Sequence, residues 1–311
     1  MKTTDKKISF VIPCYYSERT LAGVVEDIIN EFCDDDIEII LVNDGSADGT
    51  FSVIESLTQK YKFIKGINLS RNFGQDGARM AGYHFVTGDY VVTLDDDAQN
   101  PPAEAHKLIA KLEEGYDAVF GKYLIKHHSK FKNFGSKLND LMADWILEKP
   151  KNLRLCSYFV MTRFVTNEII KYEGAYPYVW GLILRTTRNV TNQVIEHRAR
   201  EIGESTYTFS KLLGLWLNGF TSFSVKPLRL TSVFGMLSAA IGFILAVYVI
   251  VRKLAYGINA DGWASMMCII LFLGGILMLM MGLLGEYVGR IYINENSAPQ
   301  FIIKDTTDTK D

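Results

Sequence analysis

Short apolar runs alternate with amphipathic helical stretches between Lys7 and Phe120. Residues 8–13 (ISFVIP) form the first run, and the apolar residues after it recur with the three- and four-residue spacing of one helix face. Residues 37–42 (IEIILV) form a second run. Farther along, the pattern predicts helices near 52–61 and 75–85 and strands near 64–69 and 90–94. This alternation is typical of an α/β fold, in which helices cover both faces of a mostly parallel sheet.

Two long uncharged runs occupy the last third of the chain. One lies between Arg229 and Arg252, and the other extends from Gly262 to Gly285. Each exceeds the roughly 20 residues that a helix needs to cross the hydrocarbon core of a bilayer. The pattern predicts a transmembrane hairpin with helices at about 230–251 and 262–285. A pair of buried core helices is the alternative.

Charged residues near the predicted hairpin indicate its orientation. A hairpin places the chain before it and the tail after it on the same side of the membrane. Positive residues close to that side outnumber those in the short connecting loop, which favours the cytoplasmic face: Lys226, Arg229 and Arg290 against Arg252 and Lys253. We therefore expect a multi-pass protein of the inner (plasma) membrane with its large N-terminal part in the cytoplasm.

The segment before the first predicted span is rich in phenylalanine, leucine and tryptophan. Residues 207–228 contain only two lysines, Lys211 and Lys226. Such a composition predicts an interfacial helix that lies on the bilayer. An ordinary core helix is the alternative.

Composition excludes several classes of protein. The 311 residues carry a net charge of −2, which argues against a nucleic-acid protein that works by general phosphate attraction. The four cysteines are far apart and form no CxxC pair, so neither a zinc site nor a disulfide framework is indicated. A reducing compartment fits them best. The N-terminus has no long apolar stretch of the kind found in signal peptides.

Three polar clusters follow predicted strands: PCYYSE (13–18), NDGS (43–46) and DDD (95–97). In open α/β sheets ligands bind beyond the carboxyl ends of the strands, so we expect these clusters to share one site. Three consecutive carboxylates repel one another unless a cation or hydrogen-bond donors offset the charge. They indicate either a metal site, in which Asp95 and Asp97 point to the same side of an extended segment, or a solvated turn.

Five stretches carry a resemblance to a known family: VIPCYYSE (11–18), VNDGSADGT (42–50), the run from LSRNFGQ to DDDAQNPP (69–102), REIGESTY (200–207) and SFSVKPLRL (222–230). With them the sequence resembles the family 2 inverting glycosyltransferases, which have the nucleotide-sugar-binding GT-A fold. More narrowly, it is similar to the polyprenyl-phosphate sugar transferase branch. That branch includes bactoprenol glucosyltransferase, dolichol-phosphate mannose synthase and undecaprenyl-phosphate aminoarabinose transferase.

The resemblance implies a reaction and its components. A sugar would move with inversion from a nucleotide sugar, UDP-linked rather than GDP-linked, to polyprenyl (undecaprenyl) phosphate for cell-envelope glycan or glycolipid modification. The family's DxD motif maps onto Asp95 and Asp97, which would hold Mg²⁺ or Mn²⁺, with Asp96 between them. The acceptor phosphate is mostly dianionic at neutral pH because its second pKa is about 6, so it needs no base. Relatives also suggest a homo-oligomer.

The resemblance also assigns roles to individual residues. Asp44 would contact the base or ribose, and Pro13, Tyr15 and Glu18 would line the same nucleotide pocket. Phosphate and donor contacts are expected from a further set: Asp96, Arg71, Arg200, Ser205, Lys122 and Lys126. Of these, Arg200 would act in catalysis with Asp95 and Asp97. Lys122 and Lys126 belong to a basic loop that would supply charge for the lipid phosphate; a solvated or headgroup-facing surface is the alternative. Arg79 also lies near the motif; for Arg71 and Arg79 a structural salt bridge is the alternative.

These assignments divide the chain into four predicted parts. They are the cytoplasmic GT-A domain, the juxtamembrane interfacial segment, the two transmembrane helices and a cytoplasmic tail, at residues 1–206, 207–229, 230–290 and 291–311. Two positions depart from the family pattern. Thr206 stands where a lysine is common, and Ser157 stands where the branch often has an aspartate proposed as a base. We expect Ser157→Ala to keep most activity.

Two other functions are compatible with this pattern. A processive polysaccharide synthase has the same fold, but such enzymes carry a QxxRW motif and usually more spans, and the sequence has neither. A catalytically inactive membrane scaffold is the second alternative. The departures at Thr206 and Ser157 leave it open, whereas the presence of both Asp95 and Asp97 argues against it.

Overall fold

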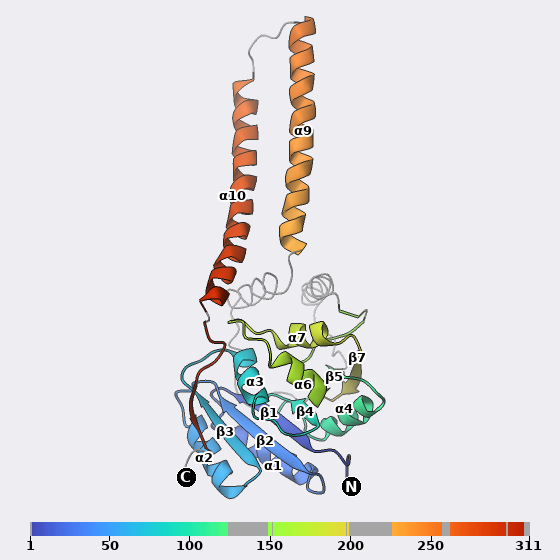
Figure 1. The fold of residues 1–311 in the computed structure, drawn as a ribbon, viewed down its shortest axis with the longest axis vertical. Helices are drawn as coiled ribbons and strands as arrows, with labels where there is room; N and C mark the ends of the chain where they lie inside the picture. Colours follow the sequence, from blue (N-terminus) through green and yellow to red (C-terminus); the bar gives the residue numbers. More distant parts are fainter. Residues whose placement is uncertain are drawn as a thin grey trace. The chain divides into compact units, whose positions relative to one another are not determined.

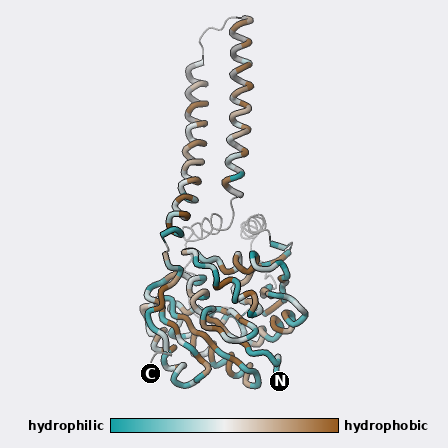
Figure 2. Tube along the Cα trace, in the orientation of Figure 1, coloured by the Kyte–Doolittle hydropathy of each residue, from teal (hydrophilic) through white to brown (hydrophobic). Residues whose placement is uncertain are grey.

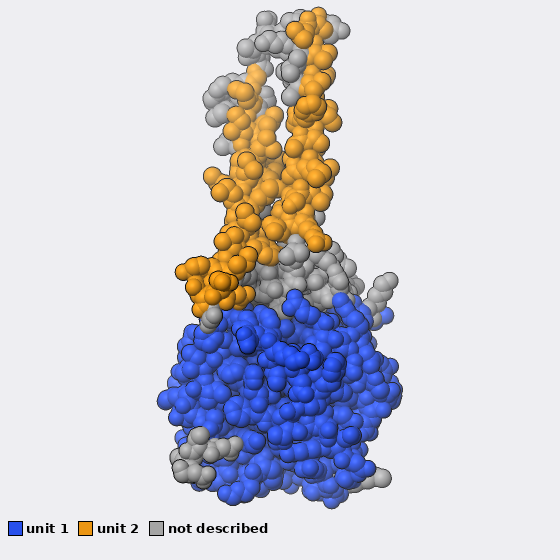
Figure 3. Space-filling model, in the orientation of Figure 1, with its two compact units in different colours: residues 1–207, 297–311 blue, residues 208–296 orange. Residues whose placement is uncertain are grey.

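The computed structural model describes residues 2–123, 149–150, 152–196, 198, 226–256, 262–296 and 298–307. The chain forms two compact units, one of residues 1–207 with 297–311 and one of residues 208–296 (Figure 3). The predicted interfacial segment, apart from its last few residues, lies outside the described residues.

The first unit is built on an eight-stranded sheet with the strand order β7-β5-β6-β4-β1-β2-β3-β8 (Figure 1). Its strands are β1 Ile8–Cys14, β2 Ile37–Asn43, β3 Ile64–Leu69, β4 Tyr90–Thr93, β5 Ala118–Tyr123, β6 Phe159–Thr162, β7 Val190–Ile195 and β8 Ile303–Thr306. Among the described strands, β6 and β8 are antiparallel to their neighbours and the other paired strands are parallel. This confirms the predicted α/β fold with a mostly parallel sheet.

Helices cover both faces of this sheet. They are α1 Leu21–Glu31, α2 Thr50–Lys60, α3 Gln75–Tyr83, α4 Glu104–Glu113, α6 Arg163–Ile169 and α7 Val179–Thr186. Strand β1 is buried along its whole length, as expected for a central strand with helices on either side. Its side chains alternate between two cores: Phe10 and Ile12 belong to a cluster with α1, α2 and α4, whereas Val11 faces α3. A Cβ at Gly82 of α3 would lie 2.6 Å from Val11 Cγ1, so the absence of a side chain there permits this close packing.

The C-terminal tail completes one edge of the sheet. Strand β8 pairs antiparallel with β3, with Thr306 opposite Ile67 and Asp305 opposite Asn68. Beyond the strand, Thr307 Oγ1 accepts a hydrogen bond of 2.9 Å from the Gly66 amide. The sequence pattern did not predict this strand. Its formation covers an edge that would otherwise expose unpaired backbone groups.

The second unit contains two long helices, α9 Lys226–Tyr256 and α10 Trp263–Glu295. Hydrophobic residues occur along both (Figure 2). Within the described residues, Phe272–Glu295 has the length and the mean hydropathy, 1.6, of a membrane span, and Thr231–Ile244 is apolar but shorter. One candidate span is therefore found, and the two-helix transmembrane hairpin stays a prediction.

Candidate active site

Strands β1, β2, β3 and β4 are parallel, so their carboxyl ends lie together at the same end of the sheet. Strand β1 lies between β2 and β4, which is the point where the strand order reverses and where ligands of open α/β sheets bind. Strand β6 runs antiparallel to β4, with Phe159 opposite Thr93. The residues just before β6 therefore lie beside the carboxyl ends of these strands.

Asp44 joins the loop after β2 to the loop after β3. Its side chain is almost fully buried, at 3% exposure. One carboxylate oxygen accepts the Phe73 amide at 2.7 Å, and the other accepts the Gly74 amide at 3.0 Å. Burial raises the pKa of Asp44, and the two amide hydrogen bonds offset only part of that rise. In this structure Asp44 fixes the loop that leads into α3.

Gly45 brings the same two loops into contact. It has φ of +64°, and a Cβ at this position would lie 2.4 Å from the carbonyl carbon of Arg71. The Arg71 side chain is exposed, and its guanidinium lies 4.5 Å from the centroid of the Phe73 ring. Arg71 therefore stands at the surface of the site, and it makes no ion pair within the described part of the chain.

The loop after β1 presents two exposed tyrosines and joins the loop after β2. Tyr15 and Tyr16 are 50% and 58% exposed, and their rings meet edge to face with centroids 4.7 Å apart. The Tyr16 amide donates to Ser46 Oγ at 3.1 Å, and Glu18 Oε2 accepts the Gly49 amide at 3.2 Å. The predicted nucleotide residues Tyr15 and Glu18 thus lie beside the loop that carries Asp44. Pro13, also predicted to line this pocket, is buried within β1.

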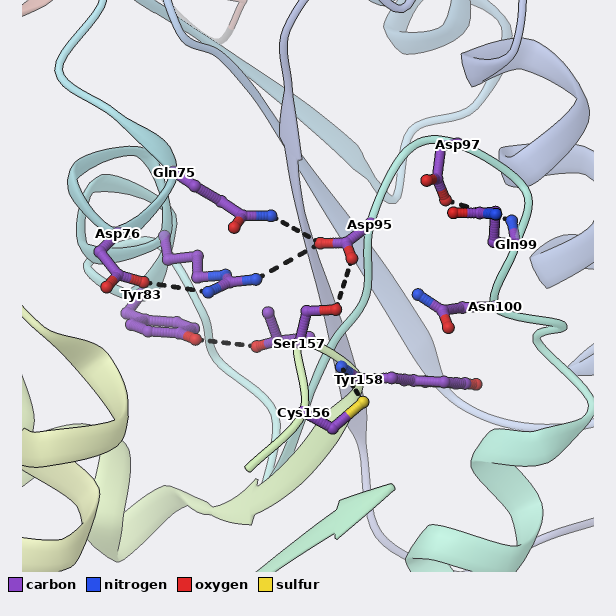
Figure 4. A network of polar contacts seen from close by, with 12 residues as sticks. Gln75, Asp76, Tyr83, Asp95, Asp97, Gln99, Asn100, Cys156, Ser157 and Tyr158 are labelled. Carbon is purple, nitrogen blue, oxygen red and sulfur yellow. Dashed lines mark hydrogen bonds and ion pairs between the residues drawn. The ribbon is translucent and has the colours of Figure 1, made fainter. Parts of the chain in front are cut away.

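Asp95 is held by three side chains (Figure 4). Its Oδ1 accepts hydrogen bonds from Gln75 Nε2 at 2.6 Å and Arg79 Nη2 at 3.3 Å. Its Oδ2 accepts one from Ser157 Oγ at 2.5 Å. Gln75 and Arg79 belong to the first turns of α3, and Ser157 precedes β6. The donors therefore come from segments that are far apart in sequence.

Arg79 is a buried cation between two carboxylates. Its side chain is 2% exposed, and it contacts Asp76 at 3.0 Å as well as Asp95 at 3.3 Å. Burial raises the pKa of Asp76, although Arg79 and the Val179 amide at the start of α7 lower it. The guanidinium stays charged, because burial lowers its pKa less than the two carboxylates raise it. The structure therefore shows the salt-bridge alternative for Arg79.

Asp96 and Asp97 turn to other partners. Asp96 Oδ2 accepts the Tyr15 amide at 3.0 Å and also bonds the Ser17 hydroxyl. Burial raises the pKa of Asp96 to about 6 in spite of these bonds. Asp97 Oδ1 accepts the Gln99 amide at 3.1 Å within its own loop. Each of the three carboxylates thus has a hydrogen-bond donor, which offsets the repulsion between them.

Neighbouring strands hold the loop that follows these aspartates. Ala98 has a positive φ of 59°, which is strained for a residue with a side chain. Tyr123 OH at the end of β5 donates to Asn100 Oδ1 at 2.6 Å, and Tyr158 OH donates to the Pro101 carbonyl at 3.1 Å. The Arg198 amide, just after β7, donates to the Gln99 carbonyl at 2.9 Å. These bonds fix a strained backbone directly beside the carboxylates.

The structure brings most of the predicted site residues together at the carboxyl ends of the parallel strands. Those in the four neighbouring loops or at the strand ends are Pro13, Tyr15, Glu18, Asp44, Arg71, Asp95, Asp96 and Asp97. Lys122 lies at the end of β5 and is partly exposed. Arg200, Ser205 and Lys126 lie outside the described residues. Sequence reasoning missed Gln75 and gave Ser157 no role. Gln75 lies four residues before Arg79 in α3, on the same side of the helix, and this spacing was the available signal. The resemblance marked the position of Ser157 but did not indicate its contact with Asp95.

Comparison with known proteins identifies the family. The sequence pattern of the family described as Glycosyl transferase family 2 matches residues 9–170. The chain belongs to glycosyl transferase family 2. It is accordingly a glycosyltransferase. A second pattern, described as GtrB C-terminal hairpin, matches residues 226–291, which include α9 and most of α10.

Curated relatives of this glycosyltransferase match it over nearly its whole length. Undecaprenyl-phosphate 4-deoxy-4-formamido-L-arabinose transferase of Proteus mirabilis (strain HI4320) is 34% identical, over 100% of this chain and 97% of the relative. The protein of the same name from Enterobacter sp. (strain 638) is 33% identical, over 96% of this chain and 93% of the relative.

Solved structures share the fold of most of this chain. Glucosyl-3-phosphoglycerate synthase from Mycobacterium tuberculosis in complex with phosphoglyceric acid superposes with a TM-score of 0.50 at 18% identity, over 70% of this chain and 80% of that one. The same enzyme in complex with Mn²⁺, uridine diphosphate and phosphoglyceric acid gives a TM-score of 0.50 at 19% identity, over 68% and 75%. These likenesses confirm the GT-A fold.

Proposed function

We propose that this glycosyltransferase moves a sugar from a nucleotide sugar to polyprenyl phosphate. The observation that carries the proposal is the similarity to the undecaprenyl-phosphate transferases, which extends over 96% of this chain or more and so includes both units. The matched hairpin pattern supports the same conclusion, because a lipid acceptor requires the enzyme to lie at a membrane. A processive synthase or an inactive scaffold gains no comparable support.

Asp95 and Asp97 would hold Mg²⁺ or Mn²⁺. The donor set fits a hard cation, since two carboxylates on one short loop offer oxygen ligands and phosphate oxygens of the donor complete the shell. Among the described residues no group of three or more His, Cys, Asp or Glu surrounds one point, so the protein alone does not form a full cage. When bound, the cation would neutralise charge on the diphosphate leaving group.

The nucleotide would lie over the loops after β1 and β2. Tyr15 offers an exposed ring in the loop after β1, and Arg71 offers an exposed guanidinium in the loop after β3. Both oxygens of Asp44 already accept backbone amides, but a carboxylate oxygen has a second lone pair that can accept from an imide or a ribose hydroxyl. A UDP-linked donor is supported by the solved structure of the same fold that holds Mn²⁺ and uridine diphosphate.

The acceptor phosphate would attack the anomeric carbon directly and invert it. A phosphomonoester with a second pKa of about 6 arrives charged, so the protein has to position it and stabilise the leaving group rather than remove a proton. We assign phosphate contacts to Arg200, Ser205, Lys122 and Lys126. Because nucleotide sugars are cytosolic, we place the unit that carries this site, residues 1–207 with 297–311, on the cytoplasmic face of the inner membrane, in a homo-oligomer.

The test is transfer of radiolabelled sugar from a panel of UDP- and GDP-sugars to undecaprenyl phosphate by the full-length protein in detergent. The proposal predicts a lipid-linked product with one donor, formed with Mg²⁺ or Mn²⁺ and abolished by EDTA. Folded protein that binds nucleotide but yields no lipid-linked product with any donor would contradict the acceptor assignment. It would favour another acceptor or the scaffold alternative.

A further inference from the structure

The carboxylate of Asp95 has one acceptor position that its neighbours in the described part of the chain leave open. Each carboxylate oxygen has two lone pairs. Among the described residues, Oδ1 accepts from both Gln75 and Arg79, whereas Oδ2 accepts from Ser157 alone. The remaining lone pair is therefore on Oδ2, the oxygen that Ser157 contacts.

The groups that orient Asp95 are themselves fixed. Arg79 is buried against Asp76, which also accepts the Val179 amide. Ser157 lies between Cys156, which is 8% exposed, and Tyr158, which is fully buried and hydrogen-bonded to the Pro101 carbonyl. The Ser157 hydroxyl is thus presented from a rigid backbone. It donates to Asp95 Oδ2 at 2.5 Å.

We propose that Ser157 is a positioning residue that turns Oδ2 of Asp95 toward the divalent cation. This inference rests on the proposed metal-dependent transfer. It replaces the expectation from sequence that Ser157→Ala would be nearly neutral. Groups that hydrogen-bond a metal ligand commonly change metal affinity about 10- to 100-fold when they are removed.

A purely structural role predicts a different outcome. Ser157 is partly exposed, so water can replace the lost bond and folding stability should change little when the hydroxyl is removed. Metal affinity, in contrast, depends on where Oδ2 points. A large change in metal affinity with a small change in melting temperature would therefore separate positioning from structural support.

The chain offers a matched control in Ser9. Its hydroxyl donates to Glu38 Oε1 at 2.6 Å, which is the same kind of serine-to-carboxylate bond, near the start of β1 and so at the opposite end of that strand. Ser9 is fully buried, so Ser9→Ala should lower the melting temperature. It should leave the affinity for metal unchanged.

The experiment measures free Mn²⁺ by electron paramagnetic resonance in titrations of the full-length protein in detergent, alone and in parallel with UDP and with GDP. Ser157→Ala should weaken Mn²⁺ binding about tenfold, and Ser157→Thr, which keeps the hydroxyl, should restore it. An unchanged Mn²⁺ affinity in folded Ser157→Ala, or a loss that Ser157→Thr fails to restore, would overturn the role of Ser157 while leaving the proposed function intact. Wild-type protein that binds no Mn²⁺ under any of these conditions would overturn the metal assignment as well.

Discussion

Replacing Arg79 by methionine removes the guanidinium between Asp76 and Asp95. Methionine keeps an unbranched apolar stem in a site that is only 2% exposed, so the change mainly deletes charge. The two carboxylates that remain are 27% and 21% exposed, so water screens them only in part. Breaking a buried ion pair by removing one partner costs about 3–5 kcal/mol.

We expect the lower end of that range because both carboxylates keep other donors. Asp95 retains Gln75 and Ser157, and Asp76 retains the Val179 amide. A loss of about 3 kcal/mol corresponds to a fall in melting temperature of about 6–12 °C for a domain of this size. The assay is thermal unfolding of the full-length protein in detergent, with and without Mn²⁺. Mn²⁺ should raise the melting temperature of the variant more than that of wild type, because Arg79 no longer competes for Asp95.

Two further variants make this prediction specific. Adding Asp76→Asn to Arg79→Met removes one of the stranded charges and should recover part of the lost stability. Lys60→Met breaks an ion pair with Glu26 at 3.6 Å in which both side chains are more than half exposed, and it should leave the melting temperature nearly unchanged. An Arg79→Met protein that melts together with wild type would refute the view that Arg79 neutralises this cluster.

Two other predictions concern the ends of the sheet. Glu38 is buried, and although burial alone would raise its pKa, hydrogen bonds from Ser9 and Thr87 leave the pKa below its ordinary value of 4.5. Its ionised form therefore adds stability above pH 4.5 that is lost as the pH falls through the lowered pKa. Urea titrations measure the free energy of unfolding of wild type and of Glu38→Gln. The value for wild type should be the larger at pH 7, and the difference should shrink below pH 4.5. A difference that stays constant with pH would contradict this. Gly45→Ala should lower both stability, by about 1–3 kcal/mol, and nucleotide affinity, because its Cβ meets the Arg71 backbone. The control is Gly23→Ala in α1, where no atom lies within 4 Å of the added Cβ, so this substitution should be neutral or stabilising. Equal effects of Gly45→Ala and Gly23→Ala on nucleotide affinity would count against contact between the loops.

Local pattern was sufficient to predict the central part of the fold. The strand expected at 64–69 is β3, and the helix expected at 75–85 is α3, which ends at Tyr83. Central parallel strands are apolar along their whole length, and their helices have one apolar face, so each signal is contained within the segment itself. The rule that ligands bind beyond the carboxyl ends of parallel strands then predicted that three separate polar clusters meet.

Partners that are distant in sequence were not predictable in this way. Ser157 contacts Asp95 across 62 positions because β6 inserts antiparallel beside β4, and no local spacing encodes that pairing. Strand β8 is a four-residue segment, IKDT, with little apolar pattern. It forms a strand by pairing antiparallel with β3. Whether the Asp44 carboxylate binds a ligand or the backbone of a neighbouring loop also depends on how close that loop comes.

The most direct test of the central claim compares wild type with Asp97→Asn in the transfer of labelled sugar to undecaprenyl phosphate. Wild type should form the lipid-linked product with Mg²⁺ or Mn²⁺ and lose it in EDTA. Asp97→Asn should reduce the rate by about a hundredfold or more at an unchanged melting temperature, because a bound cation supplies several kcal/mol of stabilisation to the leaving group. Product formation by Asp97→Asn at the wild-type rate, or by wild type in EDTA, would contradict a metal-dependent transfer at the carboxyl ends of the parallel strands.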